Sequence, residues 1–284
     1  MSASLGTGTS TDVSGTRVRR ETRARPPWLL SVPAVLAVAF LLVPLVGLLL
    51  RAPWSSLPDL LTEPAVVEAL RLSVLTATAA TALSLVLGLP LAWVLARVPF
   101  RGRGLVRALV LLPLVLPPVV GGVALLLAFG RRGVVGGPLY ELTGFSLPFT
   151  AWAVVLAEAF VAMPFLVITV EGALRSADPR YEEAAATLGA SPWRVFRRVT
   201  VPMVAPALVA GTVLCWARAL GEFGATITFA GNVPGRTQTM PLAVYLALDT
   251  DPDAAFALSL VLLVVSVTVL VALRGRWASA GAFR

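Results

Sequence analysis

The chain has 284 residues, of which 57% are hydrophobic and only 13% are charged, and its mean hydropathy is +0.86. A soluble domain is about 45–50% apolar and about 25% charged, so this composition indicates an integral membrane protein in a lipid bilayer. The net charge is +8 at pH 7 and every basic residue is arginine. Such a charge can attract nucleic acid, but the arginines lie around apolar segments, so we expect no nucleic-acid partner.

The residues that usually carry catalysis are scarce. The chain has no histidine and a single cysteine, Cys215. The commonest general base is therefore missing, an intrachain disulfide is impossible, and Cys215 in its apolar segment is expected to be a buried, inert thiol. A nucleotide-binding motif and a cluster of metal ligands are also missing. We therefore expect no catalytic residue, no metal site and no cofactor bound by this chain.

Apolar stretches organise the whole chain. A hydrocarbon core about 30 Å thick is crossed by about 20 helical residues. The stretches of sufficient length are residues 28–50, 70–96, 105–129, 149–170, 203–230 and 255–273. The predicted fold is an all-α integral membrane protein with six transmembrane helices. Residues 1–27 are predicted to be a disordered tail, residues 28–273 the transmembrane domain, and residues 274–284 a second tail.

The first apolar stretch could also be the core of a secretory signal peptide. Residues 28–50 are longer than such a core usually is, and no small-residue cleavage site follows them. We therefore expect this stretch to be retained as a transmembrane helix.

The arginines predict the orientation of the spans. If the N-terminus is inside, 17 arginines fall on the inner side, in the two tails and in the loops 97–107 and 171–201. Only five fall on the outer side, and the pair Arg131 and Arg132 is the awkward feature among them. The positive-inside bias therefore places both termini in the cytoplasm.

The loop of residues 171–202 is the most structured polar segment. Asp178 followed by proline is typical of a helix start, Gly189 of a helix end, and Ser191 followed by proline of a second start. The second short helix would present the exposed aromatic residues Trp193 and Phe196 together with Arg194, Arg197 and Arg198. Such a helix pair could dock on a partner protein, with aromatic residues filling its pockets, or lie on anionic lipid. The residues alone favour neither.

A motif in this loop resembles a known family. Glu183, Ala184 and Ala185 are followed at the right spacing by Gly189 and then by the apolar run that ends in Pro202. This pattern resembles the EAA signature of the membrane subunits of binding-protein-dependent ABC importers, with valines in place of the usual isoleucine and leucine. The match falls in the loop that the arginines place in the cytoplasm, between the fourth and fifth spans.

The resemblance implies a function for the loop and a set of partners. In such permeases it holds a coupling helix that docks into an ABC ATPase subunit, and that ATPase, not the permease, uses ATP and Mg. An extracytoplasmic oxyanion-binding protein and a second permease copy, as a homodimer, are the other implied partners, in the plasma membrane. The residues implied in ATPase coupling are Glu183, Ala184, Ala185, Gly189, Trp193, Arg194 and Phe196.

Two further segments bear on the transported solute. Residues 218–245 and 112–122 resemble the corresponding segments of molybdate permeases. The resemblance implies an importer of molybdate, with tungstate not separated from it by any residue, and related sulfate and thiosulfate permeases are the alternative. A secondary transporter is a weaker hypothesis, because no internal repeat of the spans is evident and the EAA loop would be unexplained.

Ionisable residues inside the predicted spans are candidates for the translocation path. Arg218 and Glu222 are four residues apart and would share one helix face, and Glu158 lies near the middle of the fourth span. Charged groups in a bilayer are costly and usually face the protein interior or water. The pair could neutralise itself for structural reasons, or line the path together with Glu158 and Thr226, where Arg218 would offer donors to an oxyanion.

Two other features have open interpretations. Residues 231–239 form a polar, turn-rich outer loop that could gate the mouth, contact the binding protein through Asn232 and Arg236, or only connect helices. The prolines at 113, 117 and 118 in the third span could line the route or only kink a helix.

Overall fold

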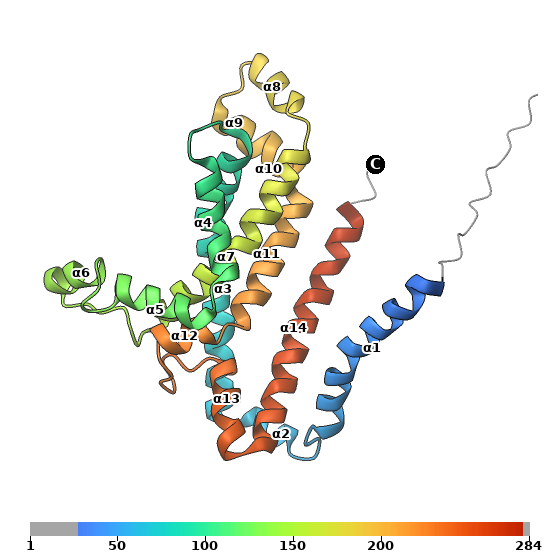
Figure 1. Cartoon of the computed structure of the whole chain (residues 1–284), viewed down its shortest axis with the longest axis vertical. Helices are drawn as coiled ribbons and strands as arrows, with labels where there is room; N and C mark the ends of the chain where they lie inside the picture. The colour runs from blue at the N-terminus through green and yellow to red at the C-terminus, as the bar shows by residue number, and fades with distance from the viewer. Residues whose placement is uncertain (1–27, 281–284) are drawn as a thin grey trace, which may run out of the picture. The chain divides into compact units, whose positions relative to one another are not determined.

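A computed structural model describes residues 28–280, and all regular elements in that range are helices (Figure 1). The chain divides into two compact units, residues 1–47 and residues 48–284. The first holds most of α1 (Trp28–Arg51), a helix whose large apolar side chains are exposed, as suits contact with lipid or another apolar surface. The predicted N-terminal tail lies outside the described residues.

The core of the second unit consists of three long helices that pack side by side. They are α3 (Pro64–Arg97), α7 (Ala151–Ser176) and α11 (Ala205–Leu220). Small residues allow this close approach. A side chain at Gly88 of α3 would come within 3.1 Å of Val167, and one at Gly211 of α11 within 3.2 Å of Leu166, so both contacts with α7 depend on glycine.

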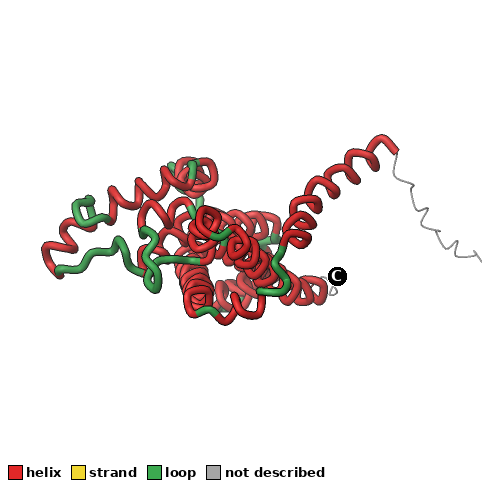
Figure 2. Tube along the Cα trace, turned by 90° about the horizontal axis from the view of Figure 1, so that it is seen from below, coloured by secondary structure: helices red, strands yellow, loops and turns green. Residues whose placement is uncertain are grey.

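The last long helix, α14 (Pro252–Ala280), packs against α11 and against α13 (Met240–Thr250). It continues past residue 273, where the sequence predicts a tail to begin. The short helix α2 (Leu57–Thr62) packs on α3 and α14. In Figure 2 the second unit is seen from below as helices joined by loops, without strands among the described residues.

Two of the six predicted spans are broken. Four helices are long and apolar enough to cross a membrane by themselves, and two bent pairs raise the number to six if each pair is one span. In the third predicted span the helix axis bends by 118° between α4 (Arg103–Val115) and α5 (Pro118–Phe129). The break falls at Leu116 and Pro117, because consecutive prolines remove hydrogen-bond donors and push the preceding residue out of the helical region.

The fifth predicted span is also discontinuous. A bend of 76° lies at its start, between the helical run Pro192–Met203 of the preceding loop and α11, and the span itself breaks after Leu220, before α12 (Gly224–Phe229). The expectation that 203–230 is one continuous helix is therefore wrong. Glycines at 221 and 224 make the second break inexpensive, because glycine has little helix propensity to lose.

These breaks arrange the second unit into three levels (Figure 1). The short helices α8 (Arg180–Thr187), α9 (Pro192–Val195) and α10 (Val201–Met203) lie at one end of the bundle. Helices α2 and α13 lie at the opposite end. Helices α5, α6 (Gly136–Thr143) and α12 lie between the two ends, with α5 and α6 projecting to one side.

Candidate functional site

The EAA loop forms two short helices, as the sequence predicts. The Asp178 carboxylate accepts a hydrogen bond from the backbone N–H of Arg180 at 3.0 Å, which starts α8. Gly189 follows the end of α8 with φ +83°, and a side chain there would meet nothing within 4 Å. Glycine is therefore required for its left-handed backbone and not for space. Ser191 precedes α9 but makes no side-chain cap bond.

A π-helical segment joins α9 to α10 and was not predicted. It is η1 (Phe196–Thr200), in which the turn is one residue wider than in an α-helix. The ring of Phe196 stacks on Trp193 at 5.6 Å between centroids and meets the edge of Trp93 at 6.1 Å. Because Trp93 belongs to α3, η1 contacts a helix far away in the sequence.

The predicted coupling residues divide into exposed and half-buried groups. Glu183, Ala184, Gly189 and Arg194 are exposed, and Trp193 is 69% exposed. Ala185 and Phe196 are half-buried. Two residues that the sequence analysis did not select, Tyr181 and Leu188, are 65% and 89% exposed. We call the exposed set Tyr181, Glu183, Ala184, Leu188, Trp193 and Arg194 the coupling surface.

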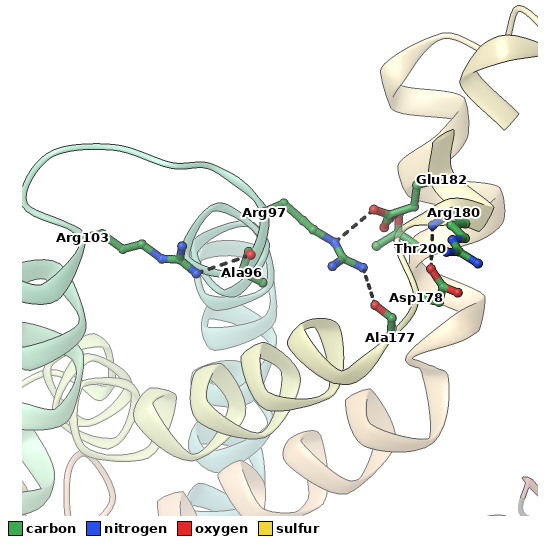
Figure 3. A network of polar contacts seen from close by, with 8 residues as sticks. All are labelled: Ala96, Arg97, Arg103, Ala177, Asp178, Arg180, Glu182 and Thr200. Atoms are coloured by element: carbon green, nitrogen blue, oxygen red, sulfur yellow. Dashed lines mark hydrogen bonds and ion pairs between the residues drawn. The ribbon is translucent and has the colours of Figure 1, made fainter. Parts of the chain in front are cut away.

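A polar network fixes the loop to the bundle (Figure 3). The Arg97 Nε atom at the end of α3 lies 3.0 Å from Glu182 Oε2 of α8, and both side chains are only 15% exposed. The Arg97 guanidinium also donates to the Ala177 carbonyl oxygen after α7, at 3.5 Å. Thr200 of η1 donates to Glu182 Oε1 at 2.7 Å. One arginine and one glutamate thus join α3, α8, η1 and the end of α7.

Neither member of this ion pair was predicted from the sequence. Each residue has a recognisable position in the sequence: Glu182 directly precedes the glutamate of the motif, and Arg97 is the last residue of α3. Nothing in the sequence pairs them, because they are 85 positions apart. A second ion pair joins Arg107 of α4 to Glu171 of α7, with Arg107 Nε donating to Glu171 at 3.0 Å. Glu171 falls within the predicted loop 171–202, but α7 continues to Ser176 in the structure, so this pair lies outside the segment that joins α7 to α11.

The predicted pair in the fifth span forms, but not on one helix. Arg218 lies in α11, whereas Glu222 follows the end of that helix. Their side chains meet at 2.6 Å, with Arg218 29% and Glu222 1% exposed. The second oxygen of Glu222 accepts the backbone N–H of Ala225 at 2.8 Å and so caps the start of α12. Glu222 therefore bridges the break between the two helices.

The α12 segment is also held by direct backbone packing. A side chain at Gly122 of α5 would lie 2.7 Å from Thr228 Cβ and 2.8 Å from the Ala225 carbonyl oxygen. One at Gly224 would lie 2.7 Å from Pro118 Cβ. Gly122 and Gly224 therefore allow α5 and α12 to pack closely.

The other two path candidates are buried with unsatisfied oxygens. Glu158 is 1% exposed, and its Oε1 accepts the Thr76 hydroxyl at 3.0 Å. Its Oε2 has no hydrogen-bond partner, and neither does the hydroxyl of the fully buried Thr226. Buried polar atoms without partners are rare in native structures and often mark functional places.

The predicted outer loop is ordered by its own contacts. Thr237 Oγ1 accepts the backbone N–H of Val233 at 2.9 Å. Gly235 has φ +73°, and a side chain there would lie 2.9 Å from a carboxylate oxygen of Glu68. Asn232 is half-buried with its Oδ1 unpartnered, and Arg236 is exposed.

Within residues 28–280 no group of three or more acidic, histidine or cysteine side chains could hold a metal ion.

Comparisons with known proteins agree with the motif. Residues 84–279 match the family described as binding-protein-dependent transport system inner membrane component. Over 227 residues the chain is 52% identical to the molybdenum transport system permease protein ModB of Mycobacterium bovis, which covers 80% of this chain and 85% of the relative. Over 211 residues it is 39% identical to the sulfate transport system permease protein CysT of Escherichia coli K12, covering 73% and 76%.

The fold has a counterpart among solved structures. It matches a chain of a bacterial ABC transporter involved in the import of the acidic polysaccharide alginate, with a TM-score of 0.67 over 89% of this chain and 96% of that chain. At 19% identity this likeness shows the fold alone. With membrane-length helices, an EAA loop at one end and a family match over most of its length, the chain belongs to the binding-protein-dependent transport system inner membrane components.

Proposed function

We propose that this chain is the membrane-spanning permease subunit of an ATP-driven importer of molybdate or tungstate. The family supports a permease, and the higher identity to a molybdenum permease than to a sulfate permease, 52% against 39%, supports the solute. Sulfate or thiosulfate is the alternative solute, favoured by the sulfate relative. Molybdate and sulfate are both tetrahedral oxyanions, so the translocation path would need the same kind of hydrogen-bond donors for either solute.

The coupling surface is the observation that carries this proposal. Leu188 and Trp193 are 89% and 69% exposed beside Arg194, so the surface combines apolar and charged side chains that a partner could cover. Buried aromatic residues are frequent hot spots in protein interfaces, and the neighbouring Arg194 and Glu183 would supply the polar rim. We therefore expect the coupling surface to be buried against a protein partner instead of facing solvent. In this proposal the partner is an ABC ATPase subunit.

The remaining features of the assembly follow from this role. The chain would hydrolyse no ATP itself, since ATP and Mg would be used by the partner ATPase. It would work as a homodimer, because one bundle lines only part of a closed route and two-fold symmetry completes it. The EAA loop and both termini would be cytoplasmic, in the plasma membrane, and an extracytoplasmic oxyanion-binding protein would dock at the opposite end.

The charged break between α11 and α12 is the proposed place on the route. The Arg218 side chain is 29% exposed and keeps guanidinium donors that Glu222 does not occupy. A passing dianion would compete with Glu222 for Arg218, so the anion would be held and then released instead of trapped. Glu158 and Thr226 would supply the buried polar groups alongside.

The test is substrate-stimulated ATP hydrolysis. The chain would be purified with its ATPase subunit and its binding protein, placed in proteoliposomes, and assayed with molybdate, tungstate and sulfate in turn. We expect molybdate and tungstate to stimulate hydrolysis and to accumulate inside, with sulfate ineffective. Stimulation by sulfate alone would replace the solute, and ion-gradient-driven uptake without ATP would refute the importer.

A further inference from the structure

The end of α3 holds the EAA loop at two points. Trp93 and Arg97 are four residues apart on α3 and therefore lie on one face of its last turns. Trp93 meets Phe196 of η1, and Arg97 pairs with Glu182 of α8, so the two residues contact the second and the first half of the loop. The chain itself connects the loop only to α7 and α11. Within residues 28–280, the polar and aromatic contacts between the loop and α3 are made by Trp93 and Arg97.

The ion pair is built to resist separation. Both side chains are 85% shielded from water, and each has a further partner, the Ala177 carbonyl for Arg97 and the Thr200 hydroxyl for Glu182 (Figure 3). Arg97 Nε lies within ion-pair distance of Glu182 but makes no hydrogen bond, so the contact is electrostatic, and removing one member of such a shielded pair leaves the other charge uncompensated. Displacement of α8 without α3 would break this arrangement, so the two elements are expected to move together.

We propose that Arg97 and Glu182 are positioning residues that transmit movement of the EAA loop to α3. The proposal rests on the proposed function, in which an ATPase moves this loop. It adds a route that the motif does not contain, because α3 packs along α7 and α11 and would carry the displacement into the bundle as a whole. Without the pair, the loop would still dock but would pull only on the two helices to which the chain joins it.

The variants Arg97→Gln and Glu182→Gln test this transmission, and a matched control exists. The pair Arg107 and Glu171 also joins two helices through an arginine and a glutamate, but it involves no residue of the segment between α7 and α11. Each variant would be reconstituted as the full transporter with ATPase and binding protein. Three quantities would be measured: the amount of copurifying ATPase, molybdate-stimulated ATP hydrolysis, and molybdate taken up per ATP hydrolysed.

We expect Arg97→Gln and Glu182→Gln to keep the ATPase bound and to lower molybdate uptake per ATP about tenfold, within the usual range of coupling between two sites, about 5- to 150-fold. The double variant should be no worse than either single variant, because both remove the same contact. Arg97→Lys, which keeps the charge, should recover part of the loss. Arg107→Gln should leave uptake per ATP unchanged.

Three results would overturn the inference. Uptake per ATP equal to wild type in both variants would show that α3 needs no such contact. Loss of the ATPase in proportion to the loss of uptake would mean that the pair only shapes the docking surface. An equal loss in Arg107→Gln would mean that any ion pair of the bundle has this effect. If wild-type hydrolysis is not stimulated by molybdate, the proposed solute fails instead, and the coupling ratio is measured with the oxyanion that does stimulate it.

Discussion

Two Arg–Glu pairs lie in the regions to which we assign function, and they are built differently. Arg218 and Glu222 are four residues apart and bridge a break between α11 and α12 at 2.6 Å. Arg97 and Glu182 are far apart in the chain and join α3 to the EAA loop at 3.0 Å. The first pair shapes one segment of the proposed route, whereas the second connects separate elements. An Arg–Glu ion pair in a membrane bundle can therefore stabilise the end of one helix or connect two distant elements. The further partners of the two side chains distinguish these roles.

The largest expected effect is at the EAA loop itself. Gly189→Val should abolish uptake, because a β-branched residue at φ +83° is strained even though space is available. Glu183→Lys, which reverses a charge on the coupling surface, should act likewise. Membrane insertion should persist in both. Pull-down of the ATPase checks this, and variants that still bind the ATPase and transport normally would contradict the coupling role of the loop.

A smaller but strong effect is expected at the local pair. Arg218→Gln should slow transport while the complex stays assembled, if the guanidinium meets the passing oxyanion. If the pair is only structural, each single change leaves a charge uncompensated, at a cost of about 3–5 kcal/mol in strongly buried pairs. Thermal stability of the complex and oxyanion-stimulated hydrolysis are to be followed together.

The double variant Arg218→Gln with Glu222→Gln separates these outcomes. Recovery of stability without transport supports the path role, whereas recovery of both removes it. Glutamine at 222 keeps an oxygen that can accept the Ala225 N–H, so the cap of α12 survives the change. Since Glu158 is a possible substitute partner for Arg218, the series is to be repeated with Glu158→Gln.

Packing around the same break should matter less than its charges. Gly122→Ala places a methyl group 2.7 Å from Thr228 Cβ and 2.8 Å from a backbone oxygen, and overpacking of this kind typically costs about 1–3 kcal/mol. Gly172→Ala in α7, where a side chain would meet nothing within 4 Å, is the control. A lower unfolding temperature only in Gly122→Ala is expected, and equal temperatures would show that α5 and α12 can separate cheaply.

Single cysteine substitutions for thiol labelling should affect transport least, and they would determine which end of the bundle is cytoplasmic. In a background with Cys215→Ser, the variants Asp59→Cys and Asp251→Cys should react with an impermeant thiol reagent in intact cells. Arg194→Cys should react only after lysis. Asp59 lies in α2 and Asp251 between α13 and α14, at the end of the bundle opposite α8 (Figure 1). The reverse labelling pattern would invert the proposed topology.

Local features of the site were accessible from the sequence. The start of α8 just after Asp178, the turn at Gly189 and the proximity of Arg218 to Glu222 follow from interactions between residues a few positions apart. Four predicted spans are single long helices in the structure. In the other two, the prolines and glycines were visible, but whether they bend a helix or break it depends on neighbours that satisfy the freed backbone groups.

The sequence by itself determined that this is a helical membrane protein with an EAA loop, because composition, apolar length and motif spacing are properties of the chain in one dimension. The tertiary structure alone decided that Glu222 caps a separate helix, that Glu158 keeps an unpartnered oxygen, and that Arg97 meets Glu182. Arg97 and Glu182 meet between α3 and α8, 85 positions apart, whereas Glu222 acts across the break between α11 and α12. Helix propensity does not encode the first contact, and whether Glu222 lies within a helix or between two depends on the packing around the break, because these energies exist only once the helices have met.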